Sequence, residues 1–236
     1  MPRVDKIMVF DTETSGVDVE NDRIVTAFIG LMDPDGTMTE FHEWLIDPGI
    51  PIPEGASDIH GITTEKAHAE GRKDIDKALM EIATKLDYAS RWNYPVVIMN
   101  APYDLTILDR ELRRHVGIKN FRAPNVVLDT FVIDKKLYTF RKGSRKLVDL
   151  ARIYGVPVEE NAHDAQADCR MAGRVTLKQL QHEWLAPLTL AQIHHRQIKN
   201  KADQAASLQA YFDKKGTVAT VRPEWPMYPF EESTNA

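Results

Sequence analysis

The order of strand-like and helix-like segments constrains the fold of this chain more than any other feature. Three mostly apolar segments of strand length come first, at residues 6–10, 24–31 and 38–46. The Asp-Pro-Asp-Gly turn signal at 33–36 separates the second from the third. Consecutive strands joined by short turns are typical of an antiparallel meander, so we expect this arrangement at the start of the chain.

Helix-like and strand-like segments alternate after the meander. Apolar runs at 95–99 and 126–128 are suited to two further strands. Helices are expected near residues 74–88, 100–115, 130–138, 147–154 and 165–184. A strand meander followed by this alternation predicts an α/β fold with a mixed sheet.

The composition indicates an ordinary globular protein. Of the 236 residues, 43% are hydrophobic and 28% are charged, close to the average for soluble domains. The sequence has no run of about 18 apolar residues and begins without the apolar stretch of a signal peptide, so we expect no association with a membrane. The single cysteine, Cys169, cannot form an internal disulfide, which favours a cytoplasmic location.

The net charge of −5 bears on the class of function. Proteins that bind nucleic acid without metal ions depend on basic patches for most of their non-specific affinity. An enzyme that holds phosphates through metal ions can do without such an excess, because the metals carry the local positive charge. The charge therefore argues against a pure binding module more than against a metal-dependent nuclease.

Two acidic residues stand at the end of the first predicted strand. Asp11 and Glu13 are two positions apart, and alternate residues of a strand face the same side. Both carboxylates can therefore point at one spot, where like charges are costly unless a cation lies between them. A solvated strand end before a turn is the alternative interpretation, since the residues around the pair favour turns.

Further acidic residues stand at the starts of two predicted helices. Asp104 follows the second buried strand, where it can simply complement the helix dipole, and Asn100 can act as a helix cap. Asp168 is placed in the first turns of the last long helix, with His163 in the loop before it. Taken singly, Asp164 as a cap and an ordinary surface histidine account for this segment.

Taken together, four carboxylates and one histidine match what two divalent metal ions need. Oxygen ligands are suited to Mg²⁺ or Mn²⁺. Two such ions about 4 Å apart stabilise the attacking and leaving oxygens of an in-line phosphoryl displacement. A histidine, whose ordinary pKa is near neutral, can supply the base.

Three short blocks of sequence carry a family resemblance. They are Asp-Thr-Glu-Thr-Ser-Gly at 11–16, Asn-Ala-Pro-Tyr-Asp at 100–104 and His-Asp-Ala-Gln-Ala-Asp at 163–168. In this order they resemble the three exonuclease motifs of the DnaQ-like DEDDh family, which includes the proofreading epsilon subunit of bacterial DNA polymerase III. The resemblance covers roughly residues 6–185. It implies a ribonuclease H-like fold, with a mixed five-stranded sheet flanked by helices, and 3′–5′ exonuclease activity that releases nucleoside 5′-monophosphates.

The resemblance also implies a role for each matching residue. Asp11, Glu13, Asp104 and Asp168 would be the ligands of two divalent metal ions, Mg²⁺ or Mn²⁺, with Asp11 bridging both. His163 would be the general base that activates the attacking water.

Four more residues are candidates for binding the substrate. The segment at 59–63 resembles a loop of the family that follows the third strand, which makes His60 a candidate contact of the terminal nucleotide, although a loop histidine without a ligand is the alternative. Thr12, Thr14 and Asn100 are the other candidates, and Thr14 can instead hold the turn.

Two positions depart from the family pattern. Met99 stands where members often have a histidine, and its apolar surroundings indicate a core residue. Gly55 stands where members often have a glutamate five residues before the loop histidine, and Glu54 is one position away. A contact between this loop and the terminal 3′-hydroxyl is therefore left open.

The C-terminal part has a different character. We expect an exonuclease domain at 1–187 and an extension at 188–236 that is helical and then rich in proline and aromatic residues. Residues 188–214 are interpreted as two helices. The aromatic side chains of the tail can stack on bases, but packing of the tail onto the nuclease domain is the favoured interpretation; these are Trp225, Tyr228 and Phe230.

Two groups of basic residues invite a functional interpretation. Six Lys and Arg residues between 135 and 146 form either a solvated loop or a rim that contacts phosphates of the incoming strand. His194 and His195 are adjacent, and adjacent helical side chains diverge, which argues against a metal site there.

Three functions remain in consideration. The favoured one is an exonuclease acting at the 3′ end of single-stranded DNA, free-standing or serving a DNA polymerase in trans. An RNA-trimming enzyme resembling ribonuclease T or oligoribonuclease has the same catalytic residues, because sugar selection depends on contacts to the 2′ position. A catalytically silent nucleic-acid-binding or polymerase-tethering module would be marked by the loss of a metal ligand, and none is lost.

Overall fold

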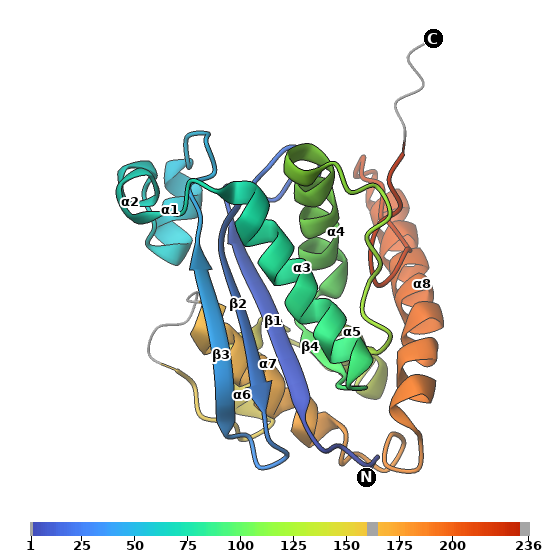
Figure 1. Ribbon diagram of the computed structural model, residues 1–236. Helices are drawn as coiled ribbons and strands as arrows, with labels where there is room; N and C mark the ends of the chain where they lie inside the picture. The colour runs from blue at the N-terminus through green and yellow to red at the C-terminus, as the bar shows by residue number, and fades with distance from the viewer. Residues whose placement is uncertain (1, 160–164, 232–236) are drawn as a thin grey trace.

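A computed structural model describes residues 2–159 and 165–231, and the part it describes contains one five-stranded mixed sheet (Figure 1). The strand order is β3-β2-β1-β4-β5. The strands are β1 (Ile7–Thr14), β2 (Ile24–Met32), β3 (Met38–Leu45), β4 (Val96–Ile98) and β5 (Val127–Asp129). The first three pair antiparallel as a meander, and β4 and β5 join in parallel. The predicted mixed five-stranded sheet is confirmed.

Strand β1 is longer than predicted. It continues through Asp11 and Glu13, which pair with Phe28 and Thr26 of β2, and the register shifts only between Glu13 and Thr14. The predicted strand segment at 6–10 was therefore too short. The apolar run stops at Phe10, but backbone pairing to β2 extends the strand over its polar residues.

The side chains of β1 alternate between two hydrophobic cores. Met8 and Phe10 pack with α3 (Ile75–Arg91) and α4 (Ala101–Glu111) on one face of the sheet. Ile7 and Val9 pack on the other face with α5 (Thr130–Leu137), α6 (Leu147–Ile153) and α7 (Ala165–Gln179). A strand covered on both faces needs a continuous apolar run, which is what residues 7–10 provide.

Helix α7 lies very close to the sheet at Gly173. A Cβ atom at this position would come within 2.8 Å of Val9 Cγ1 and of Met32 Sδ. Such contacts are shorter than packed atoms tolerate, so only glycine permits this approach. The close packing brings the first turn of α7 to the middle of the sheet.

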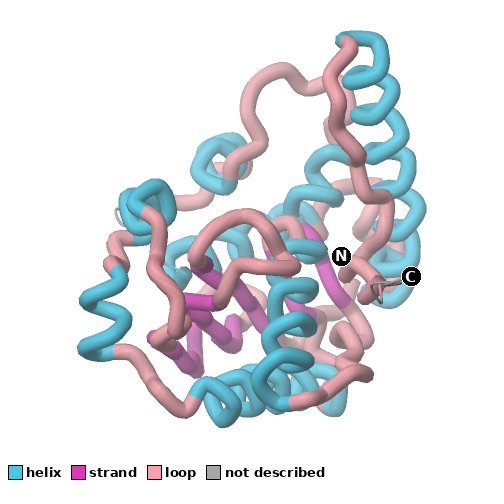
Figure 2. Tube along the Cα trace, turned by 90° about the horizontal axis from the view of Figure 1, so that it is seen from above, coloured by secondary structure: helices cyan, strands magenta, loops and turns pink. Residues whose placement is uncertain are grey.

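We had expected a loop at 59–63, but this segment lies between and partly within two short helices at 54–70, which belong to the cyan elements of Figure 2. Helix α1 (Glu54–His60) ends at Gly61, whose φ of 74° is left-handed, and α2 (Thr64–Glu70) begins after the Thr63 cap. The loop prediction holds only for the connection between them. Ile52 and Ala67 form a small separate core with Val25 of β2, and this packing holds the helices.

The C-terminal part differs from the prediction in two places. Helix α7 ends at Gln179, before the expected 184, because the chain turns there and packs Leu185 and Leu188 against the core. Helix α8 (Leu190–Lys215) is one helix rather than two. No glycine or proline interrupts it, Thr189 and Gln192 form a capping box at its start, and Gly216 ends it.

The tail after α8 packs onto the body of the protein. Trp225 is 6% exposed and belongs to the core between α3, α4 and the sheet. The interpretation of tail packing is thereby confirmed for this residue. Helix η1, a π-helix (Leu112–Val116), extends α4 towards the tail.

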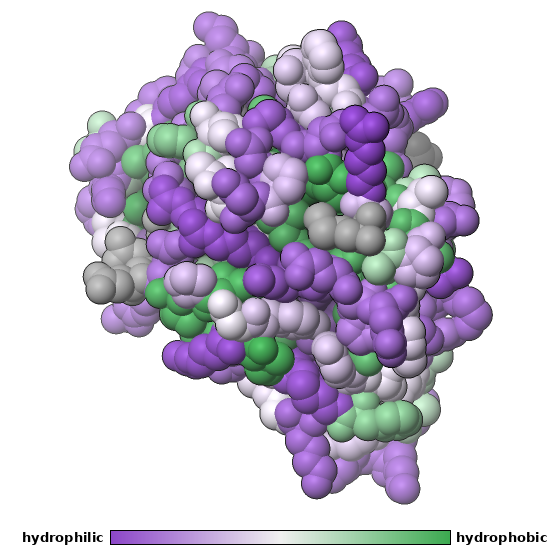
Figure 3. Space-filling view, turned by 90° about the horizontal axis from the view of Figure 1, so that it is seen from below, coloured by the Kyte–Doolittle hydropathy of each residue, from purple (hydrophilic) through white to green (hydrophobic). Residues whose placement is uncertain are grey.

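The surface is mainly polar. Seen from below, hydrophilic residues dominate and hydrophobic ones form separate patches among them (Figure 3). In the described residues, no helix combines the length and apolar character needed to cross a membrane.

Candidate active site

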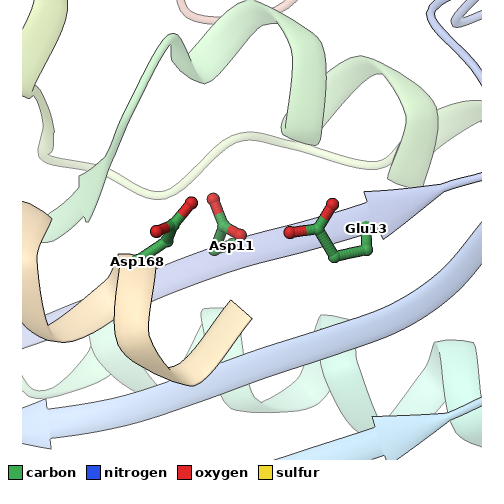
Figure 4. A group of neighbouring side chains, drawn as sticks. All are labelled: Asp11, Glu13 and Asp168. Atoms are coloured by element: carbon green, nitrogen blue, oxygen red, sulfur yellow. The ribbon is translucent and has the colours of Figure 1, made fainter. Parts of the chain in front are cut away.

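Three of the predicted metal ligands meet at one place. Asp11 and Glu13 on β1 and Asp168 on α7 each offer a carboxylate oxygen, and these oxygens lie within 4.8 Å of one another (Figure 4). The period of two in β1 directs the first two carboxylates to the same face, and the close approach at Gly173 supplies the third. All three side chains are partly exposed, so an ion can reach them from solvent.

Asp104 is not part of this cluster, but it contacts Thr12, the residue between Asp11 and Glu13 in β1. Its side chain is 3% exposed, and Oδ1 accepts hydrogen bonds from Thr12 N at 3.0 Å and Thr12 Oγ1 at 2.7 Å. Strand β4 pairs with β1 only at Met8 and Val9, which leaves the Thr12 N–H to this carboxylate. Burial raises the pKa of Asp104 to about 7, although the Thr12 bonds act in the opposite direction.

His163, the predicted general base, lies outside the described residues, as does Asp164. Its role stays a prediction. The described part of α7 begins at Ala165 and already contains Asp168 in its first turn.

A hollow of about 560 Å³ opens beside the end of β1. His60 reaches into its wall, where Nδ1 accepts from Ile62 N at 3.2 Å and Nε2 is 3.3 Å from the Thr14 carbonyl. Nε2 must therefore carry the proton and donate. Burial lowers the pKa of His60, with the Thr14 contact opposing it, so a neutral ring is expected at pH 7.

Tyr103 is a residue of this hollow that the sequence interpretation did not single out. Its hydroxyl donates to the Gly16 carbonyl and lies in hydrogen-bonding contact with Thr14 Oγ1. Thr14 Oγ1 also donates to Gly16 O at 2.7 Å. The sequence offered one signal for Tyr103: it directly precedes Asp104, so one helical turn carries both side chains to the site.

Two exposed apolar side chains flank the hollow and were also missed. Val17 is 90% exposed and Ile59 is 56% exposed, and both line it. Gly55, the position that departs from the family pattern, lies in the same wall, while Glu54 begins α1 outside it. Single exposed apolar residues are common, but two facing one hollow make a surface on which a planar group can pack.

Asn100 does not cap α4 with its side chain. It has left-handed backbone angles, φ 68° and ψ 54°, and makes no side-chain cap hydrogen bond. The carboxylate of Asp129 caps the helix instead, accepting from Asn100 N at 3.2 Å and Ala101 N at 3.0 Å. The capping interpretation was wrong, and a role of Asn100 in substrate binding stays a prediction.

The basic residues between 135 and 146 do not all face solvent. Arg141 Nη2 and Arg145 Nε lie 2.7 and 2.9 Å from Oδ2 of Asp134, whose side chain is fully buried. These two guanidinium groups neutralise a buried carboxylate. His194 is likewise engaged, because its Nδ1 accepts from Val127 N at 3.0 Å.

Comparison with known proteins agrees with this geometry. The model of the exonuclease family, RNase T, matches residues 8–176. Exonuclease CP81 of Escherichia phage 186, itself uncharacterized, is 33% identical over 177 residues, 71% of this chain and 84% of that protein. A PolC-type DNA polymerase III of Streptococcus suis is 30% identical over 168 residues, 71% of this chain. The chain spans only 11% of the length of that polymerase.

Solved structures show the same fold. E. coli exonuclease I in complex with a dA16 oligonucleotide superposes with a TM-score of 0.64 at 19% identity, over 75% of this chain and 41% of that one. Exonuclease X in complex with 5′ overhanging duplex DNA gives 0.53 at 19% identity, over 81% of this chain and 99% of that one.

The sheet order defines a ribonuclease H-like fold, which the solved exonucleases share. The chain belongs to the exonuclease family, and its resemblance to the DnaQ-like members is confirmed. The exonuclease family is a family of nucleases, and the carboxylate cluster offers oxygen ligands of the kind that divalent metal ions prefer.

Proposed function

We propose that this exonuclease uses two divalent metal ions, Mg²⁺ or Mn²⁺, to release nucleoside 5′-monophosphates from the 3′ end of DNA. The carboxylate cluster of Asp11, Glu13 and Asp168 carries this proposal. Three carboxylate oxygens within 4.8 Å of one another repel strongly unless cations neutralise them. Hard oxygen ligands that are open to solvent fit Mg²⁺ and Mn²⁺ better than soft metals.

Asp11, Glu13 and Asp168 would hold the ions, and Asp104 would complete the set. Bound ions would supply positive charge to the attacking and leaving oxygens of the phosphodiester. Thr12 fixes Asp104 through two hydrogen bonds to one oxygen, which leaves Oδ2 of Asp104 for the site. The role of His163 is to accept the proton of the attacking water, and this assignment depends on its position in the third motif.

The hollow beside β1 would receive the terminal nucleotide. Val17 and Ile59 offer apolar contact to a base. Such contact does not depend on which base is at the 3′ end of the DNA. His60 and Tyr103 are held by the backbone of residues 14–16, where each already donates its one proton. From these fixed positions the His60 ring can pack against the nucleotide, and the Tyr103 oxygen can accept a hydrogen bond from the sugar. Thr12, Thr14 and Asn100 remain candidate substrate contacts within this arrangement.

The choice of DNA over RNA is supported by the relatives. The PolC-type protein is a DNA polymerase, and the exonuclease I structures include complexes with the oligonucleotides dA16 and dT13. The match to a PolC-type polymerase also supports the proposal that this exonuclease works with a DNA polymerase, which would be a separate chain. We retain the division into an exonuclease domain at 1–187 and an extension at 188–236 as part of the proposal.

Product analysis tests the proposed direction and products. A 5′-labelled single-stranded DNA should shorten from its far end one nucleotide at a time when Mg²⁺ is added, and unlabelled 5′-monophosphates should accumulate. Release of the labelled 5′ nucleotide first, or of oligonucleotides, would contradict the proposal. His163→Ala should lower kcat by about 100-fold or more, as the loss of a general base does.

A further inference from the structure

The C-terminal tail is attached to the second half of helix α4 and to η1. Tyr228 N donates to Thr106 Oγ1 at 2.9 Å, and Arg110 Nη2 donates to the Pro229 carbonyl at 2.9 Å. Farther on, the Arg113 guanidinium lies over the ring of Phe230, 4.3 Å from its centroid. Figure 1 shows the tail returning past α8 towards α4. The match to the family model ends at residue 176, so the tail lies outside the matched range while its partners on α4 and η1 lie inside it.

The tail also reaches the first turn of α4, through Asp129. Trp225 Nε1 donates to Asp129 Oδ2 at 3.1 Å, and the same oxygen accepts from Ala101 N at 3.0 Å. The other oxygen, Oδ1, accepts from Asn100 N at 3.2 Å and from two amides of α5, Phe131 N at 3.0 Å and Val132 N at 3.2 Å. Asp129 is fully buried, so these donors are what compensates its carboxylate for lost water.

Helix α8 holds Asp129 from the opposite side. The side chain of Gln197 accepts from Asp129 N at 2.7 Å through Oε1 and donates to the Val127 carbonyl at 2.9 Å through Nε2. Gln197 is 1% exposed. Two elements of the extension, α8 and the tail, therefore join α5 in fixing the backbone and the carboxylate of one residue.

The side chains of Tyr103 and Asp104 tie the first turn of α4 to β1, but the backbone donors at the start of the helix depend on Asp129. The cap residue, Asn100, makes no side-chain cap bond, and Pro102 has no N–H to donate. The backbone N–H groups of Asn100 and Ala101 both donate to the carboxylate of Asp129. This turn carries Tyr103 and Asp104 into the active site, where small displacements of a positioned group cost large factors in rate.

We propose that Asp129 is a positioning residue that the C-terminal tail completes, because the Trp225 indole fixes its carboxylate and thereby the α4 turn that carries Asp104. The extension is then part of the catalytic scaffold and not an appendage to it. This inference rests on the proposed function of the carboxylates.

The test compares two buried tryptophans in the full-length protein. Trp225→Phe deletes the indole N–H and keeps an aromatic ring. Trp44→Phe is the matched control, because Trp44 is 5% exposed and its Nε1 also donates to a carboxylate, that of Glu81, at 2.9 Å. Three quantities are measured: hydrogen exchange of a peptide spanning 100–106, Mn²⁺ affinity by calorimetry, and kcat on single-stranded DNA.

Trp225→Phe should speed exchange in the 100–106 peptide and weaken both Mn²⁺ binding and kcat by about 10-fold, a size typical of outer-shell partners of metal ligands. Trp44→Phe should change none of these beyond twofold, although both variants lower the melting temperature. Asp129→Asn, which keeps the shape and removes the charge, should reproduce the effects of Trp225→Phe.

Equal effects of the two tryptophan variants would overturn the inference, because general destabilisation would then explain them. Wild-type values for Trp225→Phe would also overturn it, as would faster exchange with unchanged Mn²⁺ affinity. An inactive wild-type protein would refute the proposed function instead, and exchange together with Mn²⁺ affinity would still decide the positioning role.

Discussion

Thr12 and Asp104 are 92 positions apart in the sequence, yet both hydrogen-bond donors of Thr12, its N–H and its hydroxyl, end on Oδ1 of Asp104. The contact joins the strand that carries Asp11 and Glu13 to the helix that carries the buried carboxylate. A displacement of either element would therefore change the relative positions of all the ligands.

Thr12→Val should separate this positioning role from simple packing. The variant keeps the N–H donor and the volume but removes the hydroxyl, so that Asp104 loses one of its two donors. We expect about 1–3 kcal/mol less stability, the usual effect of an incompletely satisfied buried group, and a kcat about 10-fold lower.

Thr39→Val is the control for this change. Thr39 lies on β3, away from the ligands, and its hydroxyl donates to Leu31 O of β2 at 3.4 Å. Unchanged kcat in Thr12→Val would show that the hydroxyl has no part in placing Asp104.

The carboxylate cluster should bind Mn²⁺ directly. In the wild type, Mn²⁺ should raise the melting temperature, because a ligand that binds only the folded state stabilises it. Asp11→Asn and Asp168→Asn should lose this increase and lower kcat by about 100-fold or more.

Without metal these two variants should be as stable as the wild type or more so, because each removes a repelling charge. Asp87→Asn, which alters an exposed carboxylate paired with Arg91, serves as control. A Mn²⁺-dependent increase that survives in both variants would contradict the assignment of the cluster.

Asp104 should make the metal-free protein less stable at higher pH. Burial raises its pKa from 3.8 to about 7. A raised carboxyl pKa gives stability that is fully present below about pH 4 and is lost as the pH rises through 7. Asp104→Asn cannot ionise, so in EDTA its stability relative to the wild type should grow over this range by about 2–4 kcal/mol, at about 1.4 kcal/mol per pKa unit.

Thermal unfolding in EDTA between pH 4 and pH 8 measures this difference. A constant difference between the wild type and Asp104→Asn would mean that the pKa of Asp104 is not raised. Adding Mn²⁺ at pH 8 should reverse the order of stability, since only the wild type keeps the complete ligand set.

The apolar walls of the hollow should affect substrate binding more than chemistry. Val17→Ser with Ile59→Ser removes two exposed apolar contacts, and we expect KM for single-stranded DNA to rise about fivefold, about 1 kcal/mol, with kcat within twofold. Phe140→Ser is a control, because Phe140 is 95% exposed and does not line the hollow. An unchanged KM would place the terminal nucleotide elsewhere.

The sequence predicted those parts of the fold that depend on local pattern. Apolar runs located the five strands of the described sheet, and the family resemblance of the three motifs implied that Asp11, Glu13 and Asp168 share one site. The end of β1 was missed because pairing with β2, a long-range interaction, extends it across polar residues. Helix α8 was divided in two because its weak periodicity gives no clear face, while its length is set by capping at both ends.

The sequence could not show which residues support the ligands. Asp129 looks like an ordinary residue before a helix, and its contact with Trp225 spans 96 positions. Val17 and Ile59 have no pattern of their own and gain significance only because they face the same hollow. Such roles arise from tertiary contacts, which neither periodicity nor spacing encodes.

The most direct test of the central claim is hydrolysis of matched 3′-labelled single-stranded DNA and RNA by the wild type and by Asp11→Asn, with Mg²⁺, with Mn²⁺ and with EDTA. The account predicts release of the labelled mononucleotide from DNA, faster than from RNA, only with metal and only in the wild type. Faster trimming of RNA would move the enzyme to RNA processing. Cleavage in EDTA, or equal cleavage by Asp11→Asn, would contradict the account.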